Sequence, residues 1–94
     1  MRWSLRARRD LLEIGRFIAR DDRGAARRWV EKLRERARQA AALPRAGRRV
    51  PELERDDVRE VLQGSYRLVY RVGDRAIEVL TVFEAHRLFP PGRP

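Results

Sequence analysis

The 94-residue sequence contains no cysteine, so neither a disulfide nor a thiolate metal site is available to it. It has no apolar run of the roughly twenty residues that a membrane span needs, and its first residues do not form a signal peptide. We therefore expect a cytoplasmic protein that contacts no membrane. We also expect no metal and no cofactor. A chain of this length forms one small domain over residues 1–94, with 90–94 as a flexible tail.

Lysine and histidine are almost absent from a chain that is strongly basic. Of the 23 basic residues only Lys32 is a lysine, His86 is the one histidine, and 14 acidic residues leave a net charge of +9. Such a balance favours an acidic partner, which can be a nucleic acid, an anionic membrane or an acidic protein. A GC-rich genome also raises the arginine content for reasons unrelated to binding, so the charge alone identifies no partner.

The first half of the sequence predicts a short strand followed by two helices. The strand is expected at residues 2–5, and Ser4 is a suitable N-cap for the helix after it. Apolar residues recur at helical spacing through residues 7–18 and again through residues 26–40, and Asp22 is placed to cap the second helix. Because the connecting loop is short, the two helices are expected to form an antiparallel hairpin with one apolar face.

The second half predicts three strands. They are expected at residues 58–62, 66–72 and 76–83, and the last is apolar on both faces along most of its length, which favours a central place in the sheet. Gly73 and Asp74 suit a two-residue hairpin turn, because glycine accepts a positive φ at the first position.

The predicted order is β-α-α-β-β-β, an α+β domain with the helical hairpin packed on one face of an antiparallel sheet. Within residues 66–72 the tyrosines and aliphatic residues share the face toward the helices, whereas Arg67 and Arg71 share the other face. We expect this arginine face to look toward solvent or a partner. Trp3 and Trp29 are expected in the core rather than on a base-stacking surface.

Several short segments together resemble the RelE/ParE superfamily of toxins from type II toxin–antitoxin pairs. They run from about Trp3 to Pro90 and read, in order, ARRDLLEIGRFIARDD, GAARRWVEKL, GRRVPEL, VREVL, YRLVYRV and IEVLTV, with a terminal HR. The resemblance implies the β-α-α-β-β-β fold and a cognate antitoxin that holds the toxin in a heteromeric complex. It also implies one of two targets: RelE-like members cut mRNA in the ribosome, whereas ParE-like members block DNA gyrase without cutting anything themselves.

The residues favour the ParE-like alternative. RelE-like nucleases carry lysines on the strand before the Tyr-Arg motif, where this sequence has Val58 and Glu60, and here no tyrosine follows the last strand. We therefore expect a gyrase inhibitor rather than an enzyme, with a metal-independent mRNA endoribonuclease as the alternative. In that alternative Arg67, His86 and Arg87 carry the chemistry. A third possibility is a toxin fold that only binds its partner and, through it, operator DNA.

A set of residues on the sheet and at the C-terminal end is expected to bind the antitoxin or the target. Its members are Arg59, Arg67, Arg71, His86, Arg87 and Phe89. The pKa of an ordinary histidine suits proton transfer near neutral pH, but a solvent-facing histidine just past a strand is the plainer interpretation of His86. Glu60 is expected to form an ion pair within the sheet or with a helix arginine. The sequence leaves open which target is bound and whether the protein is still toxic.

Overall fold

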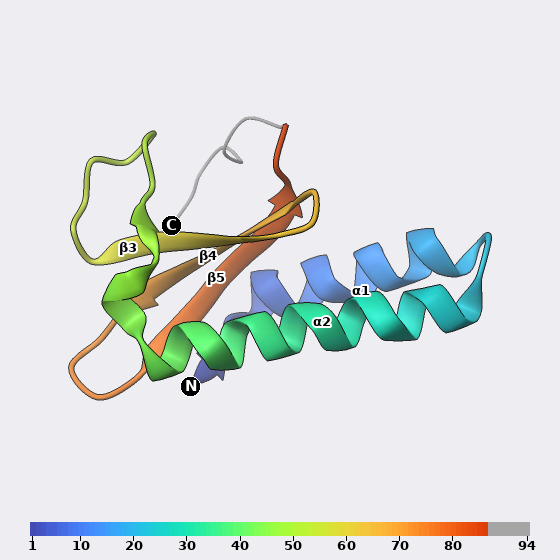
Figure 1. The fold of residues 1–94 in the computed structure, drawn as a ribbon, viewed down its shortest axis with the longest axis horizontal. Helices are drawn as coiled ribbons and strands as arrows, with labels where there is room; N and C mark the ends of the chain where they lie inside the picture. The colour runs from blue at the N-terminus through green and yellow to red at the C-terminus, as the bar shows by residue number, and fades with distance from the viewer. Residues whose placement is uncertain (87–94) are drawn as a thin grey trace.

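Two helices cover one face of a five-stranded sheet (Figure 1). The computed structural model describes residues 1–86, so the tail expected at 90–94, Arg87 and Phe89 lie outside the described residues. The elements, in chain order, are β1 (Arg2–Trp3), α1 (Leu5–Ala19), α2 (Arg23–Ala42), the 3₁₀ turn η1 (Pro44–Ala46), β2 (Arg48–Arg49), β3 (Val58–Gln63), β4 (Tyr66–Val72) and β5 (Ile77–Glu84). The predicted fold class is confirmed, and η1 and β2 are additions to it.

Both helices begin at the caps that the sequence indicated. The hydroxyl of Ser4 accepts a hydrogen bond from the backbone N–H of Ala7 at 3.0 Å, and the carboxylate of Asp22 does the same for Ala25 at 3.0 Å. These bonds satisfy N–H groups that the first turn of a helix leaves without an internal partner. Within residues 1–86 neither helix is both long and apolar enough to cross a membrane.

The sheet is mixed rather than entirely antiparallel. Its strand order is β1-β5-β4-β3-β2, and β1 runs parallel to β5 while the other neighbouring pairs are antiparallel. β5 has a partner on each side and is therefore an interior strand, but β4 holds the central place that was predicted for β5. The parallel pair forms because β1 leads directly into α1, which then packs back across β5.

The tight turn lies one hairpin earlier than expected. Gln63 pairs with Tyr66, so the β3–β4 turn has two residues, and Gly64 at its first position has φ +58°. The β4–β5 connection instead has four residues, closed by the N–H of Gly73, which donates to the carbonyl of Ala76 at 3.0 Å. Gly73 does not adopt a positive φ. The two-residue turn predicted at Gly73 is therefore wrong.

Apolar clusters lie on both faces of the sheet. The larger one packs between the sheet and the helices and includes Leu33, Leu68 and Tyr70, all fully buried. The smaller one lies on the opposite face and consists of Val50, Val58, Val69 and Phe83, with Leu53 and Leu80 packed against it. Because the segment between β2 and β3 covers this second face, the face is not the open arginine surface that strand alternation suggested.

We predict that Gly64→Ala destabilises the protein by about 2 kcal/mol, because L residues are strained at positive φ and a Cβ there overlaps the ring of Trp29. Gly24→Ala is the control, since Gly24 lies in the first turn of α2, where alanine is the better helix former. Urea unfolding followed by circular dichroism measures both. Equal effects of the two substitutions would contradict this account of the turn.

Candidate functional site

Arg67, the residue that the sequence placed in every candidate site, is buried in an ion-pair network. Its side chain is 7% exposed, and its Nη2 lies 2.7 Å from a carboxylate oxygen of Glu60 and 2.9 Å from one of Glu52. Its guanidinium also stacks over the ring of Phe83, 4.9 Å from the centroid. The expectation that Arg67 faces solvent or a partner is therefore wrong. The carboxylates of this chain already occupy the donors that a phosphate would use.

Glu60 is the acceptor at the centre of this network. Its side chain is fully buried on β3, and it accepts hydrogen bonds from Arg67 on the neighbouring strand β4 and from Arg48 on β2. The ion pair expected for Glu60 is confirmed. Glu52 completes the network with a two-bond contact to Arg67, at 2.9 and 3.0 Å. Those hydrogen bonds hold the pKa of the Glu52 carboxyl below its ordinary value.

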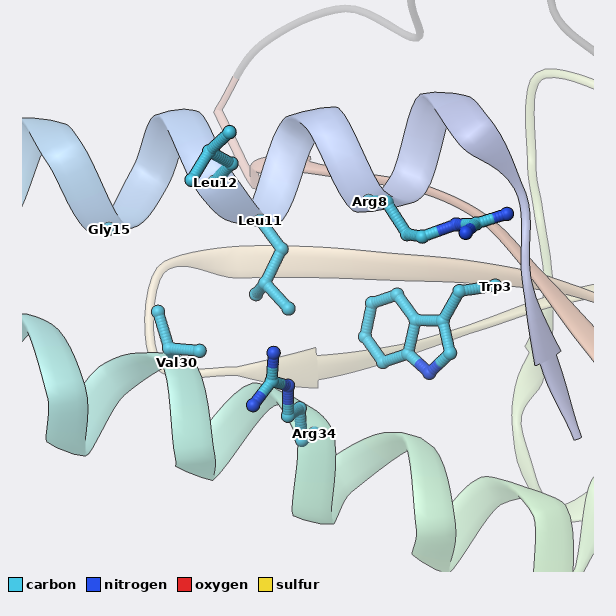
Figure 2. Close-up of a pocket in the computed structure, with 7 residues that line it drawn as sticks. All are labelled: Trp3, Arg8, Leu11, Leu12, Gly15, Val30 and Arg34. Carbon is cyan, nitrogen blue, oxygen red and sulfur yellow. The ribbon is translucent and has the colours of Figure 1, made fainter.

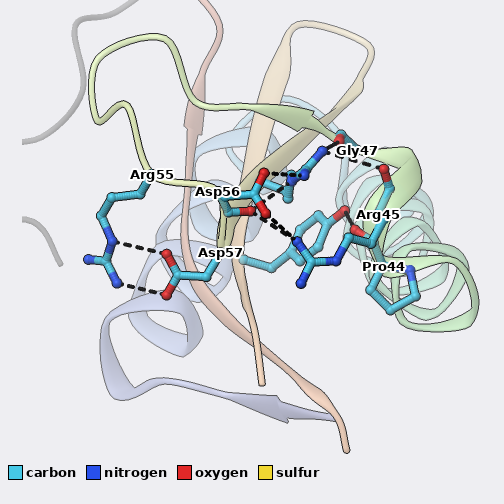
Figure 3. A network of polar contacts seen from close by, with 8 residues as sticks. Pro44, Arg45, Gly47, Arg55, Asp56 and Asp57 are labelled. Carbon is cyan, nitrogen blue, oxygen red and sulfur yellow. Dashed lines mark hydrogen bonds and ion pairs between the residues drawn. The ribbon is translucent and has the colours of Figure 1, made fainter. Parts of the chain in front are cut away.

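Arg59 and Arg71 are also paired within the chain. Arg59 contacts the carboxylate of Asp56 at 2.9 Å and donates to the carbonyl of Gly47 at 3.0 Å. Figure 3 shows Asp56 held by a second guanidinium, that of Arg45, in a group of polar contacts that fastens the segment after α2 to the start of β3. Arg71 pairs with Glu78 on β5 at 3.3 Å but stays partly exposed. Their roles in binding remain predictions.

His86 lies just past the end of β5 and is exposed. Its Nε2 is 3.7 Å from a carboxylate oxygen of Glu84. The sheet register pairs Glu84 with Tyr66 and Glu78 with Arg71, so His86 and Arg71 lie toward opposite ends of the β4–β5 hairpin. Among residues 1–86 the structure contains no group of three or more acidic or histidine side chains placed to hold a metal ion.

The excess positive charge is concentrated on the helical half of the molecule. Residues 1–43 contain thirteen basic and six acidic side chains, whereas residues 44–86 contain eight of each. In the described part of the chain, most arginines of the sheet half pair with carboxylates, but most of those on the helices do not. The helical residues that lack an ion pair to residues 1–86 are Arg8, Arg9, Arg16, Arg20, Arg23, Arg27, Arg28, Lys32, Arg34 and Arg36.

An apolar groove opens between the two helices and carries two of these unpaired arginines. Its volume is about 480 Å³, and its lining residues are Trp3, Arg8, Leu11, Leu12, Gly15, Val30 and Arg34. Figure 2 shows Trp3 and Leu11 between the helices, with Arg8 on one helix and Arg34 on the other. A Cβ on Gly15 would lie 3.2 Å from Val30, so the glycine permits the helices to approach closely. The groove offers an apolar floor between two positive groups.

The groove was not predicted from the sequence, although the position of Leu12 was a signal for it. Leu12 lies outside the apolar stripe of α1 and is 53% exposed, which marks it as surface rather than core. Trp3 was assigned to the core, and it does pack against the main cluster while one part of it lines the groove. Trp29, also expected in the core, is half-buried and packs edge-to-face against Tyr66, with ring centroids 5.6 Å apart.

Comparisons with known proteins identify the family. A family model described as the ParE toxin of the type II toxin–antitoxin system, parDE, matches residues 1–89. This chain belongs to the ParE toxin family. A protein of Sinorhizobium fredii (strain NBRC 101917 / NGR234) named "Putative toxin Y4kP" is 37% identical over 94 residues, which cover 96% of this chain and 92% of that protein. Membership of the ParE family implies a cognate antitoxin as partner.

A solved structure supports the fold independently. The chain superposes on one from the "Chromosomal ParDE TA system from P. aeruginosa" with a TM-score of 0.74, covering 90% of this chain and 94% of that one. The two chains are 19% identical, so this likeness is evidence for the fold of the ParE-family toxin and for nothing else. It agrees with two helices packed on a five-stranded sheet.

We predict that Arg67→Ala destabilises the protein by about 3 kcal/mol, because it leaves the buried carboxylate of Glu60 with Arg48 as its remaining cation. Arg71→Ala removes an arginine from the same strand but from a partly exposed pair, and we expect a loss of under about 1 kcal/mol. Urea unfolding at neutral pH gives both values. Similar losses from the two variants would show that Arg67 is not held as described.

Proposed function

We propose that this ParE-family toxin inhibits DNA gyrase by binding it, without cutting nucleic acid itself, and that its cognate antitoxin silences it. We place this activity in the cytoplasm, where the gyrase acts. The observation that carries the proposal is that Arg67, in a chain of the ParE family, is already paired with carboxylates of its own chain. A guanidinium bound by Glu52 and Glu60 is not available to steady the phosphate of an RNA substrate.

The other positions that a RelE-like nuclease needs point the same way. Val58 is fully buried in the smaller apolar cluster, and Glu60 is buried in the ion-pair network. These are the two positions at which RelE-like nucleases carry lysines. Cleavage of RNA without a metal requires a base for the 2′-hydroxyl, an acid for the leaving oxygen and cations near the phosphate. Neither of these two side chains can act as such a cation.

A supercoiling assay with purified toxin, gyrase and relaxed plasmid tests the proposal. We expect inhibition of supercoiling and accumulation of cleaved DNA, and we expect transcripts to stay intact after induction of the toxin in growing cells. Toxin mixed beforehand with the protein encoded beside its gene is the control and should leave supercoiling unchanged. Full supercoiling at a large molar excess of toxin, together with cut transcripts, would replace the proposal by the endoribonuclease alternative.

We further propose that the helix groove holds an amphipathic, acidic segment of the antitoxin. The apolar floor formed by Trp3, Leu11 and Val30 provides the buried centre that protein interfaces need. Arg8 and Arg34 flank that floor and have no carboxylate at ion-pair distance within residues 1–86, so acidic side chains of a partner can pair with them. The segment can order as it binds, as many acidic chains of low hydrophobicity do.

Leu12→Glu should weaken antitoxin binding at least tenfold, because it places a negative charge in the groove. The side chain is already 53% exposed, so the fold should tolerate the change. Leu43→Glu is the matched control, since Leu43 is 68% exposed and lies outside the groove. Titration calorimetry with the protein encoded beside the toxin gene measures both affinities. Equal affinities for Leu12→Glu and the unaltered toxin would rule out the groove as the docking site.

A further inference from the structure

The helical hairpin ends in a tip that the sheet does not support. We define the tip as residues 16–28, and Figure 1 shows the hairpin running past the ends of the strands at this end. The tip contains five arginines and two aspartates. One of the aspartates, Asp22, is engaged as the N-cap of α2, and its bond from the N–H of Ala25 holds the pKa of its carboxyl below the ordinary value.

All five arginines of the tip are exposed, and none has an ion pair to the described part of the chain. They are Arg16, Arg20, Arg23, Arg27 and Arg28. In the sheet half, by contrast, most guanidinium groups lie against a carboxylate of the same chain. Concentrating like charges on one exposed end costs self-repulsion unless an anion binds there. The tip therefore has the electrostatics of an anion-binding surface.

The tip and the groove differ in apolar content. Phe17 is the one large apolar side chain that is strongly exposed within residues 16–28, and the guanidinium of Arg20 lies over its ring at 5.9 Å. Protein interfaces have an apolar centre that is depleted in charge. The groove has such a centre and the tip does not. The tip is thus better matched to a polyanion than to a second protein.

We propose that the hairpin tip binds the phosphate backbone of double-stranded DNA. Arg16 and Arg20 on α1 are about 6 Å apart along the helix axis, and Arg23 and Arg28 on α2 are about 7.5 Å apart. Packed helices have axes about 8–10 Å apart, so all five arginines leave the backbone within one short end of the hairpin. Duplex DNA carries about one charge per 1.7 Å, and about four phosphates lie along such a length. Guanidinium groups bind phosphate oxygens in a two-bond geometry that suits this contact.

The biological role of this contact rests on the proposed function. Gyrase acts on duplex DNA, so a toxin that holds both the enzyme and the adjacent duplex gains affinity from the second contact. The binding of DNA itself does not rest on gyrase, because it is a property of the isolated toxin. It is also separate from antitoxin docking, since the lining of the groove includes none of the five tip arginines.

Fluorescence anisotropy of a labelled 20-base-pair duplex, titrated with toxin at several salt concentrations, tests the proposal. For about four phosphate contacts we expect log Kobs to fall against log salt with a slope of about −4. The triple variant Arg16→Gln, Arg23→Gln and Arg27→Gln should bind at least tenfold more weakly at low salt. Its slope should flatten by about 1.8 to 2.7, because two or three of the four contacts are lost.

The control is a triple variant of equal charge change on the sheet half, Arg49→Gln, Arg55→Gln and Arg75→Gln. It should bind DNA within about threefold of the unaltered toxin, at the same slope within about one unit for three distant charges. Equal weakening by both triple variants would overturn the proposal, because net charge rather than the tip would then govern binding. Tighter binding of an RNA duplex or of single-stranded DNA would also overturn it.

A gyrase assay on the tip variant separates this proposal from the proposed function. If the tip variant loses DNA affinity and inhibits gyrase more weakly, both stand. If it loses DNA affinity while gyrase inhibition by the unaltered toxin is absent, DNA binding stands and the gyrase proposal fails. If the tip variant loses gyrase inhibition with unchanged DNA affinity, the DNA proposal fails and the tip is a protein-docking surface.

Discussion

The buried carboxylate of Glu60 is the constraint on which the rest of the structure depends. A charge in the interior of a small domain is costly unless it is paired and hydrogen-bonded, so Glu60 requires cations on both sides of its strand. Arg67 on β4 and Arg48 on β2 supply them. Arg67 in turn holds Glu52, which brings the segment between β2 and β3 over the second face of the sheet and covers the smaller apolar cluster.

This network decides where the charge of the protein can act. Because the sheet half balances its arginines with its own carboxylates, it offers little unpaired charge to a partner. The net charge of the described residues therefore lies on the helices, at the rim of the groove and at the tip. The two surfaces differ in apolar content, and that difference separates the expected partners: an amphipathic protein segment in the groove and a polyanion at the tip. The two proposals thus assign unlike partners to adjacent surfaces of one basic protein.

Much of the fold was predictable from the sequence because its signals are local. The caps Ser4 and Asp22 and the three long strands follow from hydrogen-bonding groups and apolar periods within a few residues of each other. The parallel pairing of β1 with β5 could not be read in this way, since Arg2 and Glu78 are far apart in the sequence. The turn that contains Gly64 was expected, but the glycine with positive φ was assigned to Gly73, because both glycines follow a predicted strand.

The site was less predictable than the fold, for a physical reason. Strand alternation correctly placed Arg67 on the face away from the helices, but alternation cannot distinguish a face that meets water from one that meets a carboxylate. The deciding partner, Glu52, lies in an irregular connection whose path no periodicity describes. Leu12 stands outside the apolar stripe of α1 in the sequence, but the groove that it lines is defined only once α1 and α2 are seen side by side.

Hydrogen exchange at arginine side chains tests the central claim most directly. The Nε–H of Arg67 donates to Glu60 at 2.8 Å inside the protein, whereas Arg34 lines the open groove, and nitrogen-15 NMR follows both Nε–H protons. The account predicts that the Arg67 proton exchanges with water only when the whole domain unfolds, and that the Arg34 proton exchanges rapidly. Equal, rapid exchange at both side chains would contradict a sheet whose charges are balanced internally.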